Sequence, residues 1–310
     1  MTRPRKCGAF FLRFMKKVAI QGIRGSFHEE AAILYFGKDF QAVECMDFRS
    51  LVNQVGAGQA SFGIMAVENS LAGGMLPNFS LIRNASLQIT GEVYLRISQH
   101  LMALPGQRIE DLTEVRSHPM ALMQTEAFFL KHPGIRLVES YDTALSAREI
   151  SEEKLSQTGA VGSEQAARIF GLSILASSIE TNKENFTRFL VVGPGAPKLD
   201  KNLPVKASVA FIAPHVPGGL VKVLNPLADA GVNLSMLQSL PLVGSTWEYI
   251  FHADLIFYDQ DHASKIISDL EKKLQKLRVM GLYHPGAKPP ASINGLSNLT
   301  KEMNHVHTGR

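Results

Sequence analysis

The chain has 310 residues, of which 45% are hydrophobic and 19% are charged, and this size and composition suit about two globular domains with cores of their own. Residues 1–14 carry the whole formal charge of +4, so the remainder is neutral and lacks the basic surface that nucleic-acid binding requires. Two cysteines exclude a disulfide framework, no Cys/His spacing indicates a metal site, and no apolar run reaches the roughly 18 residues of a membrane span. We therefore expect a cytoplasmic protein with no metal and with neither nucleic acid nor membrane as a partner.

Residues 1–16 precede the first predicted strand. The apolar stretch at residues 9–12 is too short for a secretory signal, and Met15 followed by Lys16 and Lys17 resembles a natural start. We expect this segment to be a disordered extension or the product of a misassigned start site.

Strand-like and helix-like segments alternate from Lys17 to Gly193. The predicted strands are residues 18–21, 40–45, 61–67, 87–97, 100–104, 136–139, 159–162 and 190–192. Ser26 begins a helix that ends at Gly37, Pro119 begins one that runs to Leu130, and Asp142 begins one that reaches Ile150. The pattern predicts an α/β fold with mainly parallel sheets.

Small polar residues follow several of these strands. Ser26 comes after the first strand, Asn69 and Ser70 after residues 61–67, and Ser117-His118 directly before a helix. Hydroxyls and free backbone N–H groups at helix starts bind anions, so several such loops around one cleft suit a compact dianion. Gly22-x-x-Gly25 lacks the spacing of a dinucleotide or phosphate loop, which disfavours nucleotides.

The segment Asn185-Phe186-Thr187-Arg188-Phe189 precedes a buried strand at residues 190–192. Thr187 could donate to a hydroxyl or an oxyanion, Arg188 could hold a carboxylate through two hydrogen bonds, and Phe189 could pack on a ring. The same sequence is also ordinary for a structural strand, so a functional interpretation requires partners elsewhere.

A second unit follows a linker at residues 194–206, which begins with Gly-Pro-rich sequence. Strands at 207–213, 234–243, 247–257 and 279–283 and helices at 218–230 and 262–277 give the order βαββαβ. The unit spans residues 207–284, and residues 285–310 have no sustained apolar pattern, so we expect a disordered tail.

These motifs support a resemblance to two known families. Residues 17–193 resemble prephenate dehydratases, and residues 207–284 resemble the amino-acid-sensing ACT domain that follows this region in many members. The first resemblance is carried by Gly22-Ile23-Arg24-Gly25-Ser26-Phe27, Val67-Glu68-Asn69-Ser70-Leu71, Ser117-His118-Pro119, Gly162-Ser163 and Asn185-Phe186-Thr187-Arg188-Phe189. It implies a two-lobed, periplasmic-binding-protein-like catalytic region, with one lobe of residues 17–97 plus 165–193 and the other of residues 98–164.

The resemblance implies a carbon-oxygen lyase that removes water and CO₂ from prephenate to give phenylpyruvate in L-phenylalanine biosynthesis, with no metal or organic cofactor. Thr187 matches the family's catalytic residue. The expected substrate-binding residues are Ser26, Asn69, Ser70, Ser117, His118, Arg188 and Phe189. Arg188 is either a carboxylate clamp or a structural ion-pair partner, and both interpretations stay open.

Two positions depart from the family pattern. Many members have glutamine where this chain has Met120, and Glu-Ser-Arg-Pro where it has Gln238-Ser239-Leu240-Pro241. The resemblance nevertheless implies L-phenylalanine as an effector and a homodimer or homotetramer. The expected effector-binding residues are Gly218, Gly219, Leu220, Asn233, Leu234 and Gln238.

Two alternative functions remain open from the sequence. The enzyme could act on arogenate instead, because the sequence does not reveal a partner for the substrate's amino group. Two α/β lobes facing a cleft also describe solute-binding proteins, so a non-catalytic amino-acid-sensing protein is the other alternative.

Overall fold

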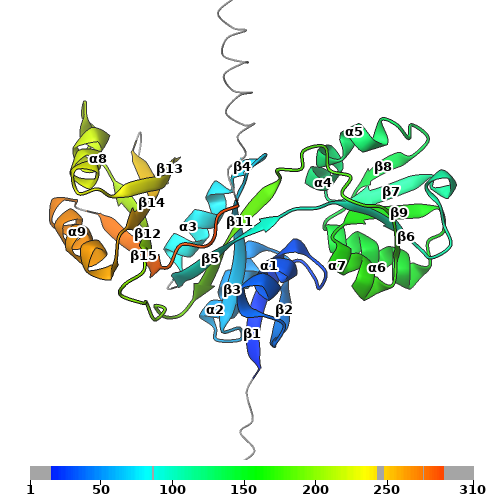
Figure 1. The fold of residues 1–310 in the computed structure, drawn as a ribbon, viewed down its shortest axis with the longest axis horizontal. Coiled ribbons are helices and arrows are strands. Elements are labelled where there is room, and N and C mark those ends of the chain that lie inside the picture. Colours follow the sequence, from blue (N-terminus) through cyan, green and yellow to red (C-terminus); the bar gives the residue numbers. More distant parts are fainter. Residues whose placement is uncertain (1–14, 86, 243–247, 275, 290–310) are drawn as a thin grey trace, which may run out of the picture.

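The computed structural model describes residues 15–85, 87–242, 248–274 and 276–289, which form three sheets with their helices (Figure 1). The expectations for residues 1–14 and 290–310 lie outside the described residues, but Lys16, which was predicted to belong to the N-terminal extension, begins the first strand, so the extension ends earlier than predicted. Residues 285–289 were predicted to begin a disordered tail, but Gly286 donates its backbone N–H to Glu92 Oε1 at 3.0 Å, so this part of the prediction is wrong.

The first sheet forms the middle of the molecule in Figure 1. Its strands run in the order β2-β1-β3-β11-β5, with β4 added to β3. They are β1 (Lys16–Gln21), β2 (Phe40–Cys45), β3 (Phe62–Asn69), β4 (Gly73–Gly74), β5 (Gln88–Arg96) and β11 (Phe186–Gly193), accompanied by helices α1 (Phe27–Phe36), α2 (Phe48–Gly56) and α3 (Leu76–Asn84). Helix α1 starts and ends as predicted, because the Ser26 hydroxyl accepts from Glu29 N at 3.3 Å and Gly37 caps the other end with φ +78°.

The second sheet has the order β10-β6-β9-β7-β8. Its elements are β6 (His100–Ala103), the 3₁₀ helix η1 (Ile109–Asp111), β7 (Glu114–Ser117), α4 (Pro119–Gln124), α5 (Glu126–Phe129), β8 (Arg136–Glu139), α6 (Thr143–Glu153), β9 (Thr158–Gly162), α7 (Glu164–Phe170) and β10 (Ser173–Ala176). The helix predicted from Pro119 to Leu130 is divided at Thr125, whose hydroxyl donates to the carbonyl oxygens of Ala121 and Leu122.

The two-lobed α/β organisation is confirmed, but both sheets are mixed rather than mainly parallel. Strand β11 runs antiparallel to β3 and β5, and β6 runs antiparallel to β9 and β10, because the chain passes between the lobes and returns. Helix α7 and strand β10 belong to the second lobe. The return crossing therefore lies at residues 177–185 instead of near residue 165.

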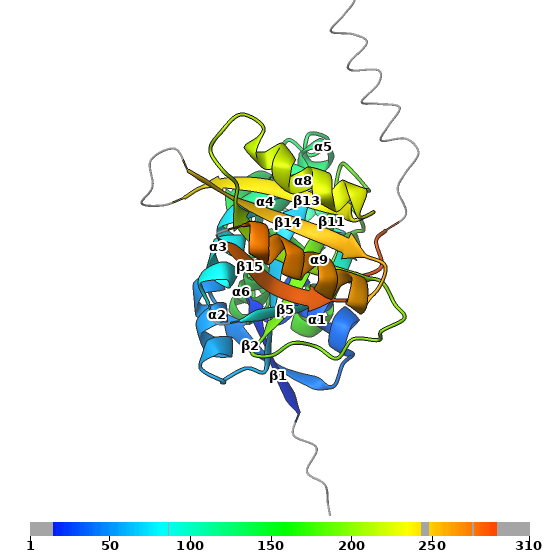
Figure 2. The same cartoon turned by 90° about the vertical axis from the view of Figure 1, so that its left-hand side faces the viewer.

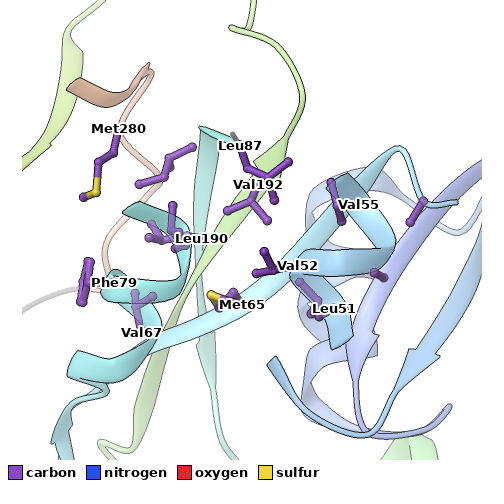
Figure 3. Close-up of a cluster of buried hydrophobic side chains, with 14 of the residues drawn as sticks. Leu51, Val52, Val55, Met65, Val67, Phe79, Leu87, Leu190, Val192 and Met280 are labelled. Carbon is purple, nitrogen blue, oxygen red and sulfur yellow. The ribbon is translucent and has the colours of Figure 1, made fainter. Parts of the chain in front are cut away.

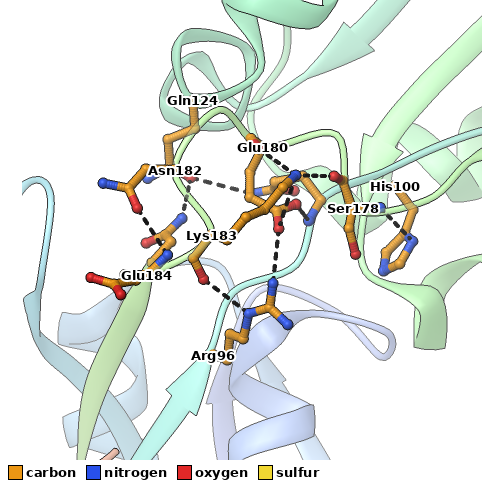
Figure 4. A network of polar contacts seen from close by, with 10 residues as sticks. Arg96, His100, Gln124, Ser178, Glu180, Asn182, Lys183 and Glu184 are labelled. Atoms are coloured by element: carbon orange, nitrogen blue, oxygen red, sulfur yellow. Dashed lines mark hydrogen bonds and ion pairs between the residues drawn. The ribbon is translucent and has the colours of Figure 1, made fainter. Parts of the chain in front are cut away.

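The two crossings are tied together by Glu180, whose side chain is buried (Figure 4). Its carboxylate accepts from Gln99 N at 2.9 Å and pairs with Arg96 Nη2 at 3.4 Å, both on the outgoing crossing. Backbone bonds from Ile97 N to Asn185 O and from Ile179 N to Gln99 O pair the two segments directly. These contacts fix the relation between the lobes on either side of the crossings.

The C-terminal unit, which contains the third sheet, has the predicted order of elements, βαββαβ. It comprises β12 (Val205–Ile212), α8 (Gly219–Asp229), β13 (Asn233–Pro241), β14 (Tyr249–Phe257), α9 (Gln260–Lys273) and β15 (Leu277–Tyr283). Its strands pair antiparallel in the order β13-β14-β12-β15. The predicted strand limits at Val243 and Trp247 lie outside the described residues.

The third sheet packs directly on the first. Helices α8 and α9 cover its outer face, while its inner face meets β5 and α3 (Figures 1 and 2). One buried cluster includes Phe79 and Leu190 from the first sheet's side and Met280 from β15 (Figure 3). A shared apolar core therefore joins the C-terminal unit to the lobe that contains β11.

Candidate active site

A cavity of about 250 Å³ lies between the first two sheets. Elements of both lobes line it, including the start of α1, the end of β3, strand β11, helix α4 and the start of α6. Its polar lining residues are Gln21, Ser26, His28, Asn69, Gln99, His118, Gln124, Tyr141, Asp142, Thr143 and Thr187. Among the described residues that line it there is no lysine or arginine, so a bound anion must be held by neutral donors and helix ends.

The lobes meet closely beside this cavity. Ser163 Oγ, at the start of α7, donates to Gly25 O at 2.6 Å, and Tyr141 OH donates to Met46 O at 2.5 Å. Gly25 has φ +88°, and a Cβ there would lie 2.9 Å from Ala166 Cα in the other lobe. Only glycine allows this approach of the two backbones.

Thr187 and Phe189 line the cavity from β11, whereas Arg188 between them does not. Successive side chains on a strand point to opposite faces, so this separation follows from the strand itself. Thr187 is 6% exposed, and its hydroxyl oxygen accepts a hydrogen bond from Asn69 Nδ2 at 2.9 Å. A hydroxyl that accepts this bond keeps its own proton free to donate to a ligand.

Asn69 is held in the orientation that this arrangement requires. Its Oδ1 accepts from the backbone N–H groups of Leu71 at 3.0 Å and Ala72 at 2.9 Å. Its Nδ2 consequently faces Thr187 and also donates to Asn185 Oδ1 at 2.7 Å. The amide is therefore a donor toward Thr187, and the Thr187 hydroxyl is left as a donor toward the cavity.

The same network continues into the second lobe. Asn185 Nδ2 donates to Gln124 Oε1 at 2.9 Å, and Gln124 lies at the end of α4. Gln124 O also accepts from Thr181 N at 2.8 Å. Thr187 is thus positioned by contacts that span both lobes.

Three helices begin at the cavity, and at each of them a capping side chain already accepts from one or two of the first backbone N–H groups. Ser26 and Asp142 cap α1 and α6, and His118 Nδ1 accepts from Met120 N at 3.2 Å at the start of α4. The first turn of a helix carries unpaired backbone N–H groups and a partial positive charge. The partial positive charge at the start of α1 is suited to a carboxylate of a small dianion.

Two titratable groups in the lining have shifted pKa values. Burial lowers the pKa of His28 to about 3, so its ring, which packs edge-on against Phe189 with centroids 5.0 Å apart, is neutral at pH 7. Burial also raises the pKa of Asp142, although backbone bonds from Leu145 and Ala144 oppose the shift. The sequence predicted Asp142 as a helix cap but did not single out His28, because nothing in the sequence distinguishes that histidine from an ordinary core residue.

Five of the predicted site residues meet at the cavity. They are Ser26, Asn69, His118, Thr187 and Phe189. The structure places Ser70 and Ser117 elsewhere: Ser70 Oγ donates to Glu184 O at 2.8 Å, and the fully buried Ser117 Oγ donates to Val161 O at 2.6 Å. Both hydroxyls stabilise backbone instead of facing the cavity.

Arg188 lies on the other face of the first sheet, in an ion pair. Its Nη2 lies 2.7 Å from Glu92 Oε2 and 2.5 Å from Asp254 Oδ2, and its side chain is 3% exposed. Burial disfavours the charged guanidinium, but the Asp254 and Glu92 carboxylates more than offset this, so the pKa of Arg188 lies well above its ordinary value. Of its two predicted roles, the geometry fits the structural ion pair.

Other residues line or support the cavity although they were not among the predicted site residues. Gln124 and Asn185 complete the amide network, and no sequence motif marks Gln124 because its role depends on contact across the lobes. Met120, which stands where many members of the family have glutamine, lines the cavity. The described residues contain no group of three His, Cys, Asp or Glu side chains that could hold a metal ion, and no described helix is long and apolar enough to cross a membrane.

The predicted effector residues are divided between two parts of the C-terminal unit, which contains the third sheet and helices α8 and α9. A cavity of about 680 Å³ includes Leu220 and residues of the loop before α8. Gly218 caps α8 with φ +74°. The next residue, Gly219, lies so close to Pro214 O that a Cβ would not fit there. Asn233 and Leu234 start β13 and Gln238 lies further along that strand, and none of the three lines this cavity.

Comparisons with known proteins agree with this architecture. The family model described as prephenate dehydratase matches residues 18–196. A bifunctional chorismate mutase/prephenate dehydratase of Aquifex aeolicus is 32% identical over 269 residues, covering 86% of this chain and 73% of that protein. Arogenate dehydratase 2 of Petunia hybrida is 35% identical over 284 residues, covering 86% of this chain and 71% of that protein.

Two solved structures are similar over nearly the whole chain. The Arthrobacter aurescens prephenate dehydratase in complex with L-Phe has a TM-score of 0.79 and 27% identity, covering 94% of this chain and all of that one. A structure described as GqqA, a quorum-quenching acylase, also has a TM-score of 0.79, with 28% identity, and covers 88% of this chain and 99% of that one.

Proposed function

The chain belongs to the prephenate dehydratase family, and we propose that Thr187 drives its reaction by donating a hydrogen bond, and then a proton, to the departing ring hydroxyl of prephenate. The observation that carries this role is the Asn69 amide, which donates to Thr187 Oγ1 at 2.9 Å and leaves the hydroxyl proton for the cavity. The chain is accordingly an enzyme of phenylalanine biosynthesis, and its reaction places it among the carbon-oxygen lyases.

The chemistry needs little beyond position and proton donation. As the ring C–O bond breaks, the ring carboxylate leaves as CO₂ and the electron pair of its C–C bond enters the ring, which becomes aromatic. The oxygen leaves as water after taking one proton, which solvent replaces at Thr187. Assistance of this kind contributes about 10²–10⁴ in rate.

The cavity lining suits the rest of the substrate. We assign the two carboxylates to the partial positive charge at the start of α1 and to the neutral polar side chains of the lining, because the described lining has no lysine or arginine and α6 begins at the Asp142 carboxylate. Phe189 provides a wall for the ring. Holding the ring, the carboxylates and the hydroxyl donor in one geometry supplies much of the catalytic effect.

An acylase reaction has weaker support in this site. Acyl transfer needs a nucleophile activated by a neighbouring base. In the described part of the chain, the Thr187 hydroxyl is hydrogen-bonded to Asn69 and to no imidazole or carboxylate. The arrangement favours a hydroxyl that donates over one that attacks.

The experiment is turnover by the purified full-length chain, in a chelator, with prephenate and arogenate offered separately. We expect phenylpyruvate from prephenate and a higher kcat/KM for prephenate than for arogenate. A preference for arogenate would reassign the substrate, and no turnover of either would leave the sensing protein as the better account.

We further propose that the third unit, residues 205–283, is an ACT domain that binds L-phenylalanine and that the protein is a homodimer or homotetramer. The support is the βαββαβ order and the similarity to the Arthrobacter aurescens structure with L-Phe. Titration calorimetry with L-phenylalanine, alongside kinetics with and without it, tests the effector. No heat and no kinetic change would show that the chain with Gln238 has lost this ligand.

A further inference from the structure

A buried cluster of charges joins the strand that carries Thr187 to the third sheet. Arg188 Nη2 lies 2.5 Å from Asp254 Oδ2 on β14, and its Nε and Nη2 both lie 2.7 Å from Glu92 Oε2 on β5. Lys206 Nζ on β12 lies 2.5 Å from Glu92 Oε1. Two buried cations and two buried carboxylates therefore balance one another in the interface between the two sheets, and the half-exposed Glu68 lies 3.9 Å from Arg188 Nη1.

One neutral hydroxyl binds Asp254, and a second binds the first. Ser208 Oγ donates to Asp254 Oδ1 at 2.6 Å, and Tyr283 OH lies 2.8 Å from Ser208 Oγ and 3.2 Å from Arg188 Nη2. Asp254, Ser208 and Tyr283 are 0% exposed. The Asp254 carboxylate is therefore held in place by a hydroxyl of its own sheet, independently of its ion pair with Arg188.

Burying this cluster between two sheets carries a large desolvation penalty. Buried ion pairs repay their desolvation only with good geometry, and apolar side chains of similar size often serve stability as well or better. Immediately beside it, an apolar cluster with Phe79, Leu190 and Met280 already joins the same two sheets. Packing alone therefore does not require charges at this position.

Arg188 is next to Thr187 in β11 and points the opposite way. A force on the Arg188 side chain acts on the backbone that sets the position of the Thr187 hydroxyl, on the other face of the same strand. We propose that Asp254, from the C-terminal unit, is a positioning residue for catalysis: it holds Arg188 and thereby places Thr187 for proton donation. This inference deepens the proposed function and rests on it.

The test is steady-state kinetics on prephenate with the full chain and Asp254→Asn. Misplacing a reacting group by about 1 Å costs up to about 100-fold, so we expect kcat to fall about 10- to 100-fold with KM changed less than about threefold. Tyr283→Phe keeps every charge and the ring, and serves if Asp254→Asn does not fold. It should lower kcat about three- to tenfold, because Arg188 loses one neutral partner.

His252→Leu is the matched control. His252 lies two residues before Asp254 on β14, is fully buried and packs on Phe79 of the first lobe, with ring centroids 5.4 Å apart. It has no contact with Arg188 among those the structure describes. This variant disturbs the same interface and should keep kcat within about twofold, so a similar loss in it would reduce the Asp254 effect to packing and overturn the inference.

A double variant separates positioning from general damage. If Asp254 acts by placing the Thr187 hydroxyl, Asp254→Asn should lower the residual kcat of Thr187→Val by less than about twofold, since no hydroxyl remains to be placed. Full additivity, or wild-type kcat in both Asp254→Asn and Tyr283→Phe, would overturn the inference while the role of Thr187 stands. Wild-type kcat in Thr187→Val would instead overturn the proposed function.

Discussion

The substitution Asn69→Asp should reverse the hydrogen bond that prepares Thr187. Asn69 Nδ2 lies 2.9 Å from Thr187 Oγ1 and 2.7 Å from Asn185 Oδ1, and the substitution puts a carboxylate oxygen in its place. Thr187 must then donate its proton to that oxygen and has none for the substrate. Losing the donor should lower kcat by about 10²–10⁴, equivalent to about 3–5 kcal/mol in the barrier.

The effect should depend on pH in one direction. At low pH the introduced carboxylic acid is protonated, and its O–H can donate to Thr187 as the amide did. The ratio of variant to wild-type kcat should therefore rise as the pH falls from 8 to 5, and burial next to Asn185 moves this recovery toward higher pH. Phenylpyruvate formation at saturating prephenate, measured across this range, gives the ratio.

Asn78→Asp is the control for the stability cost. Asn78 is also a buried amide of the first lobe that does not itself line the cavity, and its Nδ2 donates to Ala66 O at 2.7 Å. Each variant should lose about 1–3 kcal/mol of unfolding free energy, because a buried acceptor loses its donor, but only Asn69→Asp should lose turnover. Wild-type kcat in Asn69→Asp at pH 8, or equal losses of turnover in both variants, would show that the Asn69 amide does not prepare Thr187 as a donor.

Three other predictions concern the pH dependence of stability, the cavity lining and the contact between the lobes. Burial lowers the pKa of His252 from 6.5 to about 4, so the unfolded chain takes up the proton first and the stability present above pH 6.5 is lost as the pH falls toward 4. At pH 5 this loss is about 2 kcal/mol, and denaturant unfolding of His252→Leu at pH 7 and pH 5 should lack it; an unchanged pH dependence would contradict the assignment. Met120→Gln restores an amide to the cavity lining and should lower KM for prephenate about two- to tenfold in initial-rate kinetics, whereas an unchanged KM would mean that this position does not reach the substrate. Gly25→Ala forces a side chain to φ +88° and to 2.9 Å from Ala166 Cα, so thermal or denaturant unfolding should show a loss of about 1–3 kcal/mol, and wild-type stability would argue against the close contact between the lobes.

Local rules predicted the elements whose signals are local. The helix from Ser26 to Gly37 has a hydroxyl cap at one end and a glycine at the other, and β2 and β8 match their predicted limits. Sheet direction was predicted less well, because β11 pairs with residues 90 or more positions away in the chain and only the return of the chain makes it antiparallel. Because the chain returns only after β10, helix α7 and strand β10 belong to the second lobe.

The site divides along the same line. Thr187 and Arg188 are neighbours in a strand, so alternation alone implies that both cannot face one cavity and that their roles must differ. The contributions of Gln124 and Asp254 depend on contacts between lobes and between sheets, which no spacing in the sequence encodes. Ser117 fits the predicted loop but is turned inward, since its hydroxyl satisfies Val161 O.

In the proposed mechanism the Thr187 hydroxyl donates the proton to the leaving group. Thr187→Val keeps the shape of the side chain and leaves Asn69 Nδ2 bonded to Asn185 Oδ1, so the protein should remain folded. The most direct test is kcat on prephenate for Thr187→Val beside Thr187→Ser, which keeps the hydroxyl. We expect the valine variant to lose at least about 100-fold and the serine variant to stay within about tenfold of wild type. Wild-type turnover by a folded Thr187→Val protein would contradict the claim.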